Sequence, residues 1–229
     1  DLPYFFHQLE EYFATVIHKP FYIALADEEA VQYLGLDPRE YEVEEQVDLK
    51  DYLYDGEAMR TLSGKKLHKK KNHLNAFKRE YEGRYEYRRL CCSDRHQVWE
   101  FMERWRRQKA DGDVLEDSLE YEVAGIHEIL KNCSSLCVRM AAVYVDGQME
   151  AFTIGSMNER ENMAVIHIEK ANPDIKGLYQ FINQQFLVNE FPDAALVNRE
   201  DDVGMEGLRK AKMSYNPVGF ARKYMVRKR

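Results

Sequence analysis

The order of apolar segments in this sequence predicts an α/β (α+β) fold with mixed, largely antiparallel sheets flanked by helices. Apolar residues recur at helical spacing over residues 3–18, which predicts an amphipathic helix. Asp146-Gly147 is a dipeptide typical of a tight hairpin turn between two strands. Apolar segments that predict strands lie before this turn at 136–145 and after it at 149–157 and 163–169. With 229 residues, 45% of them hydrophobic, the chain can bury one large core or two smaller ones.

The first half of the chain mixes short helices and strands. The helix over 3–18 has an apolar face of Leu9, Tyr12, Phe13, Val16 and Ile17. Asp27 is placed to cap a helix that ends near Tyr33, and Ser63 to cap one that continues to Tyr81. Strands are predicted at 21–25, 41–47, 51–54 and 85–91.

The second half has a more regular order. Val98, Phe101, Met102 and Trp105 stand at i, i+3, i+4 and i+7, which indicates one amphipathic helix, and a second runs from Leu115 to Leu130. After the three strands we expect a helix at 176–189, a strand at 194–198, a helix at 204–213 and a strand at 218–226. Two helices, three antiparallel strands and then alternating helices and strands are the order of an acyltransferase of the GNAT type.

Charge is distributed unevenly in a protein whose formal net charge is -7. Residues 1–64 carry 15 acids and 4 bases, whereas residues 203–229 carry 8 bases and 1 acid. Between them, residues 63–79 hold seven cations and no acid. Such a basic segment concentrates phosphates, nucleic acid or lipid headgroups near the protein. The alternative is a solvated helix face that only keeps the protein soluble.

The composition also limits the class of protein. No apolar run approaches the ~20 residues of a membrane span, and residues 1–6 lack the basic start of a secretory signal. We therefore expect a cytoplasmic protein, from which an N-terminal piece is missing because the sequence has no initiator Met. The spacing of the four cysteines is unlike that of zinc fingers, so no metal and no required cofactor are predicted. We interpret as small, reduced core residues Cys91, Cys92, Cys133 and Cys137.

Several long motifs occur in a characteristic order. They read YLY at 52–54, LSGKKLHKKKNHLN at 62–75, IHIEKA at 166–171, and VNREDDVG at 197–204 with GLRKAKMSYNP at 207–217. The chain thereby resembles, over nearly its whole length, the family named for the C-terminal domain of phosphatidylglycerol lysyltransferase. The resemblance implies two GNAT-like units in tandem, residues 1–92 and 93–229, the first of which would lack its opening strands here.

The resemblance also implies a donor and an acceptor. Characterised members are similar to Fem-type peptidyltransferases in taking an aminoacyl group from aminoacyl-tRNA, so tRNA and a lipid headgroup or small amine are the implied partners. Acyl-CoA is the alternative donor. The segment 169–178, however, has one glycine, a proline and an acid, instead of the Gly-rich loop that cradles a pyrophosphate. A third alternative is a non-catalytic GNAT-like module that binds a polyanion or a protein. The oligomeric state stays open.

The basic segment contains one cation that points inward. On a helical wheel an apolar stripe that includes Lys70 is formed by Leu67, Leu74, Phe77 and Tyr81. A lysine there either forms a salt bridge or lines a cleft, because an unpaired buried ammonium is costly. We predict that phosphates of the donor are bound by Lys65, Lys66, Lys69, Lys70, Lys71, Asn72, Lys170, Lys176, Arg209, Lys210 and Lys212.

Polar residues at predicted strand ends are the candidates for catalysis. Glu169 ends one strand, and Asp201 follows another; either is placed to act as a general base. Tyr215 is the candidate for protonating a leaving oxygen or stabilising an oxyanion. Substrate binding is predicted for Asn198, Arg199, Glu200, Asp202 and Asn216. The alternatives are that Asp201 and Asp202 cap the helix that follows, and that His167, with apolar neighbours, is a core histidine.

Overall fold

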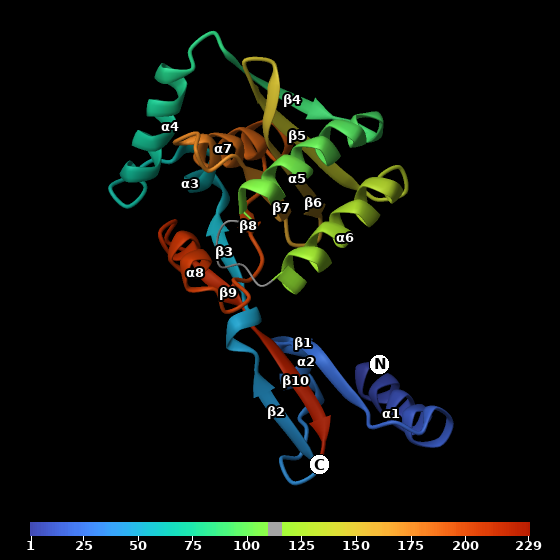
Figure 1. Cartoon of the computed structure of the whole chain (residues 1–229). Coiled ribbons are helices and arrows are strands. Elements are labelled where there is room, and N and C mark those ends of the chain that lie inside the picture. Colours follow the sequence, from blue (N-terminus) through green and yellow to red (C-terminus); the bar gives the residue numbers. More distant parts are fainter. Residues whose placement is uncertain (110–115) are drawn as a thin grey trace. The chain divides into compact units, whose positions relative to one another are not determined.

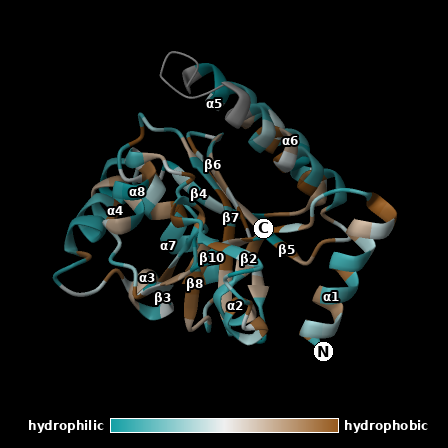
Figure 2. Cartoon of the chain, turned by 90° about the horizontal axis from the view of Figure 1, so that it is seen from below, coloured by the Kyte–Doolittle hydropathy of each residue, from teal (hydrophilic) through white to brown (hydrophobic). Residues whose placement is uncertain are grey.

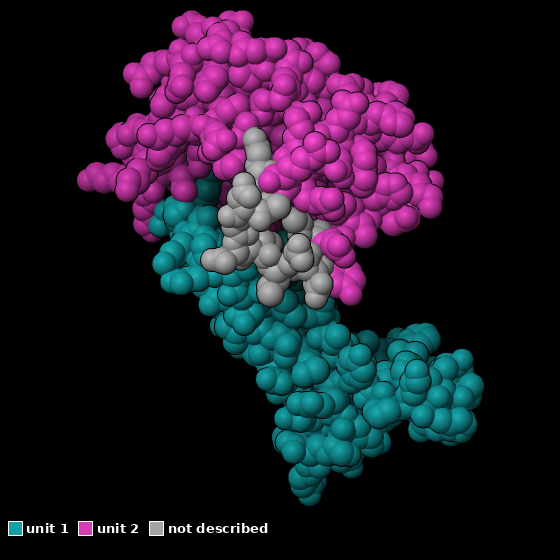
Figure 3. All heavy atoms as spheres, in the orientation of Figure 1, with its two compact units in different colours: residues 1–53, 200–229 teal, residues 54–199 magenta. Residues whose placement is uncertain are grey.

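The computed structural model describes residues 1–109 and 116–229, which form two compact units (Figure 3). Unit 1 comprises residues 1–53 and 200–229, and unit 2 comprises residues 54–199. Leu115, where the second helix of the later half was predicted to begin, lies outside the described residues. The predicted boundary between residues 92 and 93 concerns GNAT-like repeats rather than compact units, and it stays a prediction.

Unit 1 contains a three-stranded antiparallel sheet in which the last strand of the chain lies between two early ones (Figure 1). Its order is β1-β10-β2, and β9 pairs separately with residues 51–53 of β3, a strand that crosses the unit boundary. The elements are α1 (Leu2–Tyr12), continued by a π-helical turn (Phe13–Ile17), β1 (Tyr22–Asp27), α2 (Glu28–Leu34), β2 (Tyr41–Glu45), a 3-10 turn (Val47–Leu49), β3 (Asp51–Asp55), α8 (Glu206–Met213), β9 (Gly219–Ala221) and β10 (Lys223–Lys228).

Strand pairing explains the separation of charge along the sequence. The basic strand β10 lies beside the acidic strand β2, where Nε of Arg227 donates to Oε2 of Glu42 at 2.7 Å. Lys228 pairs with Glu10 at 2.5 Å between the two charged groups. The basic C-terminal block therefore offsets part of the acidic charge of the N-terminal block within unit 1. The Arg227–Glu42 pair is exposed, so it favours this strand register more than it stabilises the fold.

Helix α2 has the predicted cap, whereas helix α1 buries a different residue than the predicted apolar face. Oδ1 of Asp27 accepts a hydrogen bond from the amide of Ala30 at 2.7 Å, as predicted for the cap of α2. In α1, however, the buried residue is Phe6, which packs in a core with Ala26, Tyr41 and Val226. The residues from which the apolar face was predicted are largely exposed in this structure, among them Leu9, Tyr12 and Val16.

Unit 2 is a mixed sheet with helices on both faces. Its strand order is β4-β5-β6-β7-β8, antiparallel from β4 to β7, with β8 parallel to β7. The predicted α+β class, with mixed, largely antiparallel sheets flanked by helices, is confirmed. The elements are α3 (Gly56–Thr61), α4 (His68–Glu80), β4 (Tyr85–Leu90), a 3-10 turn (Cys92–Asp94), α5 (Arg95–Lys109), α6 (Glu116–Asn132), β5 (Val138–Val145), β6 (Gln148–Asn158), β7 (Met163–Ala171), α7 (Leu178–Glu190) and β8 (Leu196–Asn198).

Alternate residues of the strands face different helices. Ile154 lies in the core that α5 and α6 form with the sheet, whereas its neighbour Gly155 faces Phe186 of α7. Asp146 and Gly147 both have left-handed backbone angles, φ 51° and 81°, which confirms the predicted tight turn between β5 and β6. The alternation of side chains along the strands and the tight turn thus determine how β5 and β6 pair at the centre of this sheet.

Helix α4 carries the basic segment and starts later than predicted. It begins at His68, and Leu67 precedes it without a side-chain cap, so the prediction that Ser63 is the N-cap is wrong. Leu62, with φ 47°, ends α3 and turns the chain between the two helices. The predicted apolar stripe is confirmed, because Leu74 and Phe77 are buried. Figure 2 shows α4 mainly in the teal of hydrophilic residues.

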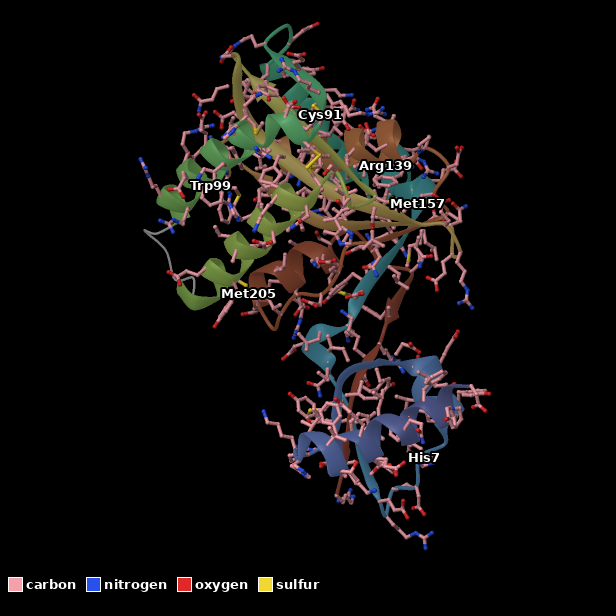
Figure 4. The ribbon with its side chains drawn as sticks, turned by 90° about the vertical axis from the view of Figure 1, so that its right-hand side faces the viewer. His7, Cys91, Trp99, Arg139, Met157 and Met205 are labelled. Atoms are coloured by element: carbon pink, nitrogen blue, oxygen red, sulfur yellow. A yellow bond between two sulfur atoms is a disulfide. The ribbon has the colours of Figure 1, made fainter. Side chains whose placement is uncertain are left out.

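The cysteines differ from their interpretation as reduced core residues. Cys92 and Cys133 form a disulfide (Figure 4), whereas Cys91 and Cys137 are exposed. The two bonded residues are separated by 41 positions in the sequence, and their Cα atoms lie 5.9 Å apart. Their proximity depends on the packing of α6 near the end of β4, which residue spacing does not reveal.

None of the helices in the described part of the chain combines the length and the apolar character needed to span a lipid bilayer.

Candidate functional site

The unit boundary falls inside the predicted run of site residues. Asn198 and Arg199 belong to unit 2 with Glu169 and the basic segment. Unit 1 contains Glu200, Asp201, Asp202, Tyr215 and Asn216. The candidate residues therefore form two groups, one in each unit.

In unit 2 a buried carboxylate holds an arginine at the end of the sheet. Nη2 of Arg199, just after β8, donates to Oε1 of Glu169 on β7 at 2.9 Å. The two side chains are 13% and 9% exposed, respectively. The guanidinium also lies 6.0 Å from the centroid of the Tyr54 ring. Two predicted site residues, Glu169 and Arg199, are thus brought together.

Asn183 completes this group, and the sequence interpretation missed it. Its Nδ2 donates to Oε2 of Glu169 at 2.7 Å, so both oxygens of that carboxylate accept hydrogen bonds. Asn183 is 1% exposed, and its Oδ1 has no hydrogen-bond partner among the described residues. The available signal was a polar residue next to the apolar positions Phe181 and Ile182 of α7. An amide on an apolar helix face indicates a specific hydrogen-bond partner, because burying an amide without one is costly.

Lys70 is the inward-facing cation of α4. Its side chain is half-buried, whereas Lys69 and Lys71 are exposed. Burial lowers the pKa of Lys70 below its ordinary value, and the positive charge of Arg199 lowers it further. Lys70 is therefore a partly desolvated cation on a helix whose other lysines are mostly exposed.

A cavity of about 560 Å³ opens at the start of α4. It is lined by Leu62, Ser63, Gly64, Lys65, His68 and Lys71. The first turn of α4 contains no acid, and the helix dipole adds partial positive charge at this end. The cavity is therefore suited to anions.

The other predicted donor-binding residues of unit 2 are in different surroundings. Lys170 forms an ion pair with Glu122 at 2.6 Å and lies 4.5 Å from the centroid of the Trp105 ring. Lys176 and Asn72 are exposed. Lys170 therefore pairs with a residue of α6, and it does not line the cavity at the start of α4.

In unit 1 Asp202 is the buried centre of an ionic group. It is 1% exposed and accepts hydrogen bonds from the Tyr52 hydroxyl and from Nε and Nη2 of Arg209, the last two at 2.9 Å. Arg209 also donates to Asp48 at 2.7 Å. The Arg209 guanidinium, together with Tyr52, lowers the pKa of Asp202 from 3.8 to about 2. Asp202 is therefore an anion that holds unit 1 together.

Replacing Asp202 by Asn should destabilise unit 1 by about 2 kcal/mol at pH 7, as the lowered carboxyl pKa implies. Because the folded pKa is below the ordinary 3.8, this stabilisation is present above that pH and is lost as the pH falls toward 2. Hydrogen exchange of unit 1 peptides across this pH range measures it. Asp48→Asn is the control, since Asp48 is 62% exposed and solvent screens its pair with Arg209, so its loss should be much smaller. Equal losses in both variants would contradict the central role of Asp202.

Asp201 has longer contacts and more exposure than Glu169. Its Oδ1 accepts from the amide of Val203 at 3.2 Å, its Oδ2 lies 3.5 Å from Nζ of Lys223, and its side chain is 22% exposed. The amide of Gly204 donates to Asp202 in the same way. These bonds close the loop before α8, whereas α8 itself begins after Met205 without a side-chain cap. The alternative that the two acids cap this helix is therefore wrong.

The remaining candidates of unit 1 are largely engaged within it. Lys212 is buried and donates to the carbonyl of Asp201, and Lys210 pairs with Glu206 at 2.7 Å on the surface. Arg209 is held by Asp202 and Asp48, and the binding of a donor phosphate by these three cations stays a prediction. Tyr215 is 6% exposed, and the following Asn216 has a left-handed φ of 56°.

Two residues of the loop before α8 have unusual backbone angles. Glu200 and Val203 have φ of 56° and 44°, angles that non-glycine side chains rarely adopt, in the loop that carries Asp201 and Asp202. His167, predicted as a core histidine, is only partly buried and shares a hydrogen bond of 2.8 Å with Ser156 across β6 and β7. Within the described ranges, no three His, Cys, Asp or Glu side chains are grouped to hold a metal ion.

Residues 1–227 match the family described as "Phosphatidylglycerol lysyltransferase, C-terminal". The chain belongs to this family. The match covers both units and every candidate residue discussed above.

Other proteins are similar to this chain in sequence or in fold. An uncharacterized protein of Mycoplasmoides gallisepticum is 29% identical over 178 residues, and the match covers 77% of this chain and 56% of that protein. A conserved protein of unknown function from Bacteroides thetaiotaomicron is 29% identical with a TM-score of 0.91, covering 100% of this chain and 76% of that one. L-PGS from Bacillus licheniformis is 16% identical with a TM-score of 0.68, covering 96% and 71% of the two chains, and shares the fold.

Proposed function

We propose that this protein transfers an aminoacyl group from aminoacyl-tRNA to an amine or hydroxyl acceptor, with a lipid headgroup as one candidate. The observation that carries the proposal is the basic helix α4 with its adjoining cavity in a chain of this transferase family. Exposed Lys65, Lys69 and Lys71 give a phosphate-binding surface without sequence specificity.

The proposed reaction is an acyl transfer without a covalent enzyme intermediate. The nitrogen or oxygen of the acceptor attacks the ester carbonyl and forms a new amide or ester bond, while the ribose oxygen leaves and takes a proton. Asp201 is the proposed base, because its contacts of 3.2 and 3.5 Å are longer than those of Glu169 at 2.7 and 2.9 Å. Tyr215 is the proposed proton donor or oxyanion partner.

The packing at the start of α7 supports aminoacyl-tRNA over acyl-CoA. In ordinary GNAT enzymes this helix N-terminus presents bare backbone amides to a pyrophosphate. Here Gly177, which precedes α7, lies so close to α4 that a Cβ on it would meet the carbonyl oxygen of His73 at 2.2 Å. Helix α4 therefore packs directly against the residue that precedes α7, which restricts access to this helix start.

Incubation with a mixture of aminoacyl-tRNAs, followed by mass spectrometry of added lipids, amines and peptides, tests the activity. We expect an acceptor heavier by one aminoacyl group, absent with deacylated tRNA. Asp201→Asn should lower kcat about a hundredfold, as loss of a general base does. Glu206→Gln, on an exposed pair of α8, is the matched control and should leave kcat unchanged.

Each other outcome identifies an alternative. Acylation from acetyl-CoA but not from charged tRNA would contradict the proposed donor. Binding of tRNA without any acylated product from the tested acceptors would favour a non-catalytic module. Full activity of Asp201→Asn would exclude Asp201 as the base.

A further inference from the structure

Helix α1 has two apolar faces, and only one of them packs into unit 1. On the inner face Phe6 is 3% exposed, and its ring makes edge contacts with Phe21 and Tyr41. Glu10 also turns inward, where one of its oxygens accepts a hydrogen bond from the Tyr41 hydroxyl at 2.9 Å. This inner face holds α1 against the three-stranded sheet.

The second face is a stripe of large apolar side chains that stays exposed. Its members follow one another at intervals of 3, 4, 3 and 4 residues, which places them on one side of the helix, with the last in the π-helical turn. Single exposed apolar residues are ordinary, but a continuous stripe of them marks an interaction surface. This α1 stripe consists of Leu2, Phe5, Leu9, Tyr12 and Val16, which are 41–61% exposed.

The spacing of the α1 stripe predicts that another helix packs on it. Intervals that alternate between three and four residues are the pattern by which two helices interlock their side chains. An extended segment has a period of two residues and would not match this pattern. The partner surface is therefore a helix with an apolar stripe of its own.

The order of side chains in the stripe favours a second copy of this chain as the partner. From either end it reads aliphatic, aromatic, aliphatic, aromatic, aliphatic, with Leu9 at the centre. A two-fold axis at Leu9 brings the same patch of two copies together, as a symmetric dimer requires. Leu9 then meets its equivalent, and Phe5 meets Tyr12 of the second copy, so that aromatic rings pack on aromatic rings.

The charges of α1 are compatible with this pairing. Gln8 and Thr15, which flank the open side of the stripe, carry no charge. Glu11 lies on the side of the helix away from the stripe, and Glu10 is turned inward. Two copies can therefore meet at Leu9 without bringing like charges together, which would oppose association.

We propose that the α1 stripe is a homodimer interface, in which two copies of this chain pack their α1 helices antiparallel about a two-fold axis at Leu9. With Ile17 included, six large side chains about half exposed offer on the order of 600 Å² per copy. Specific interfaces bury about 600–1,000 Å² per partner, so this one is small. The dimer should be reversible, with a Kd on the order of 10 μM.

Opposite charges placed at Leu9 test the interface. Sedimentation equilibrium of the wild type should show a monomer and dimer in exchange at concentrations about tenfold below and above that Kd. Leu9→Glu and Leu9→Lys, each alone, should weaken dimerisation at least about a hundredfold, because like charges then meet at the axis. An equimolar mixture of the two variants should regain the dimer, because opposite charges meet instead. Glu11→Lys, away from the stripe, is the matched control and should leave the Kd unchanged.

A cross-link locates the axis independently of affinity. In a background of Cys91→Ser and Cys137→Ser, which removes the exposed thiols, Leu9→Cys should form a covalent dimer on mild oxidation, whereas Glu11→Cys should not. Leu9 is 49% exposed, so its variants should keep the wild-type unfolding midpoint.

Three outcomes would overturn the proposal. The first is a wild type that stays monomeric over the whole range, which would leave the stripe to a different partner. The second is a wild-type dimer that persists in both charged variants of Leu9, and the third is cross-linking of Glu11→Cys as readily as of Leu9→Cys.

Discussion

Gly177→Ala should destabilise unit 2 by about 3 kcal/mol or more. Gly177 has φ 85°, a left-handed angle that costs an alanine about 1 kcal/mol. A Cβ there would also meet the carbonyl oxygen of His73 at 2.2 Å and its carbonyl carbon at 3.0 Å, so α4 would have to move away from α7. Such overpacking against backbone costs a further ~1–3 kcal/mol. Urea denaturation followed by fluorescence measures it, because both tryptophans, Trp99 and Trp105, lie in unit 2.

Gly147→Ala is the matched control for this prediction. Gly147 has a similar φ of 81°, but a Cβ on it would meet no atom within 4 Å. It should cost only the ~1 kcal/mol of backbone strain. The difference between the two variants isolates the close approach of α4 to α7. Equal losses of stability would mean that α4 and α7 are packed less closely than the structure indicates.

Removing three exposed cations of the basic segment should weaken RNA binding about a hundredfold at low salt. The change is Lys65→Ala, Lys69→Ala and Lys71→Ala together. Each lysine contacts phosphate without base specificity, so the slope of log affinity against log salt should fall by about 3. The three side chains are exposed, and their loss should leave the unfolding midpoint unchanged. Filter binding of tRNA over a salt series measures both quantities.

The matched control removes the same charge elsewhere in unit 2. Arg106, Arg107 and Arg160 are exposed on α5 and in the turn after β6. Their replacement by Ala should change affinity by less than about threefold, because distant surface charges are screened. If both triple variants weaken binding alike, attraction depends on net charge alone and the basic segment has no special role.

The sequence predicted the elements whose signals are local. The cap of α2 at Asp27 and the turn at Asp146-Gly147 each depend on a few neighbouring residues. Helix α3 was missed because it has only six residues, Gly56–Thr61, too few for a periodic signal. The start of α4 was predicted too early, because Ser63 resembles a cap although the chain turns there first.

The candidate site was predicted in part. The motifs indicated Glu169 and Arg199, and their ion pair is present, but their partner Asn183 lies outside every motif that was used. Arg209 has partners in Asp202 and Asp48, and Lys212 donates to the backbone carbonyl of Asp201, so their predicted role in donor binding stays a prediction. A charge run does not reveal which of its members have partners in the fold.

By itself, the sequence determined the family, the α+β class and the inward position of Lys70, because motifs and periodicity are properties of neighbouring residues. The tertiary structure alone decided that the basic C-terminal strand pairs with acidic segments, that Cys92 meets Cys133, and that Asn183 holds Glu169. Those contacts join residues far apart in the chain. Their distances follow from how strands and helices pack, and no local pattern encodes them.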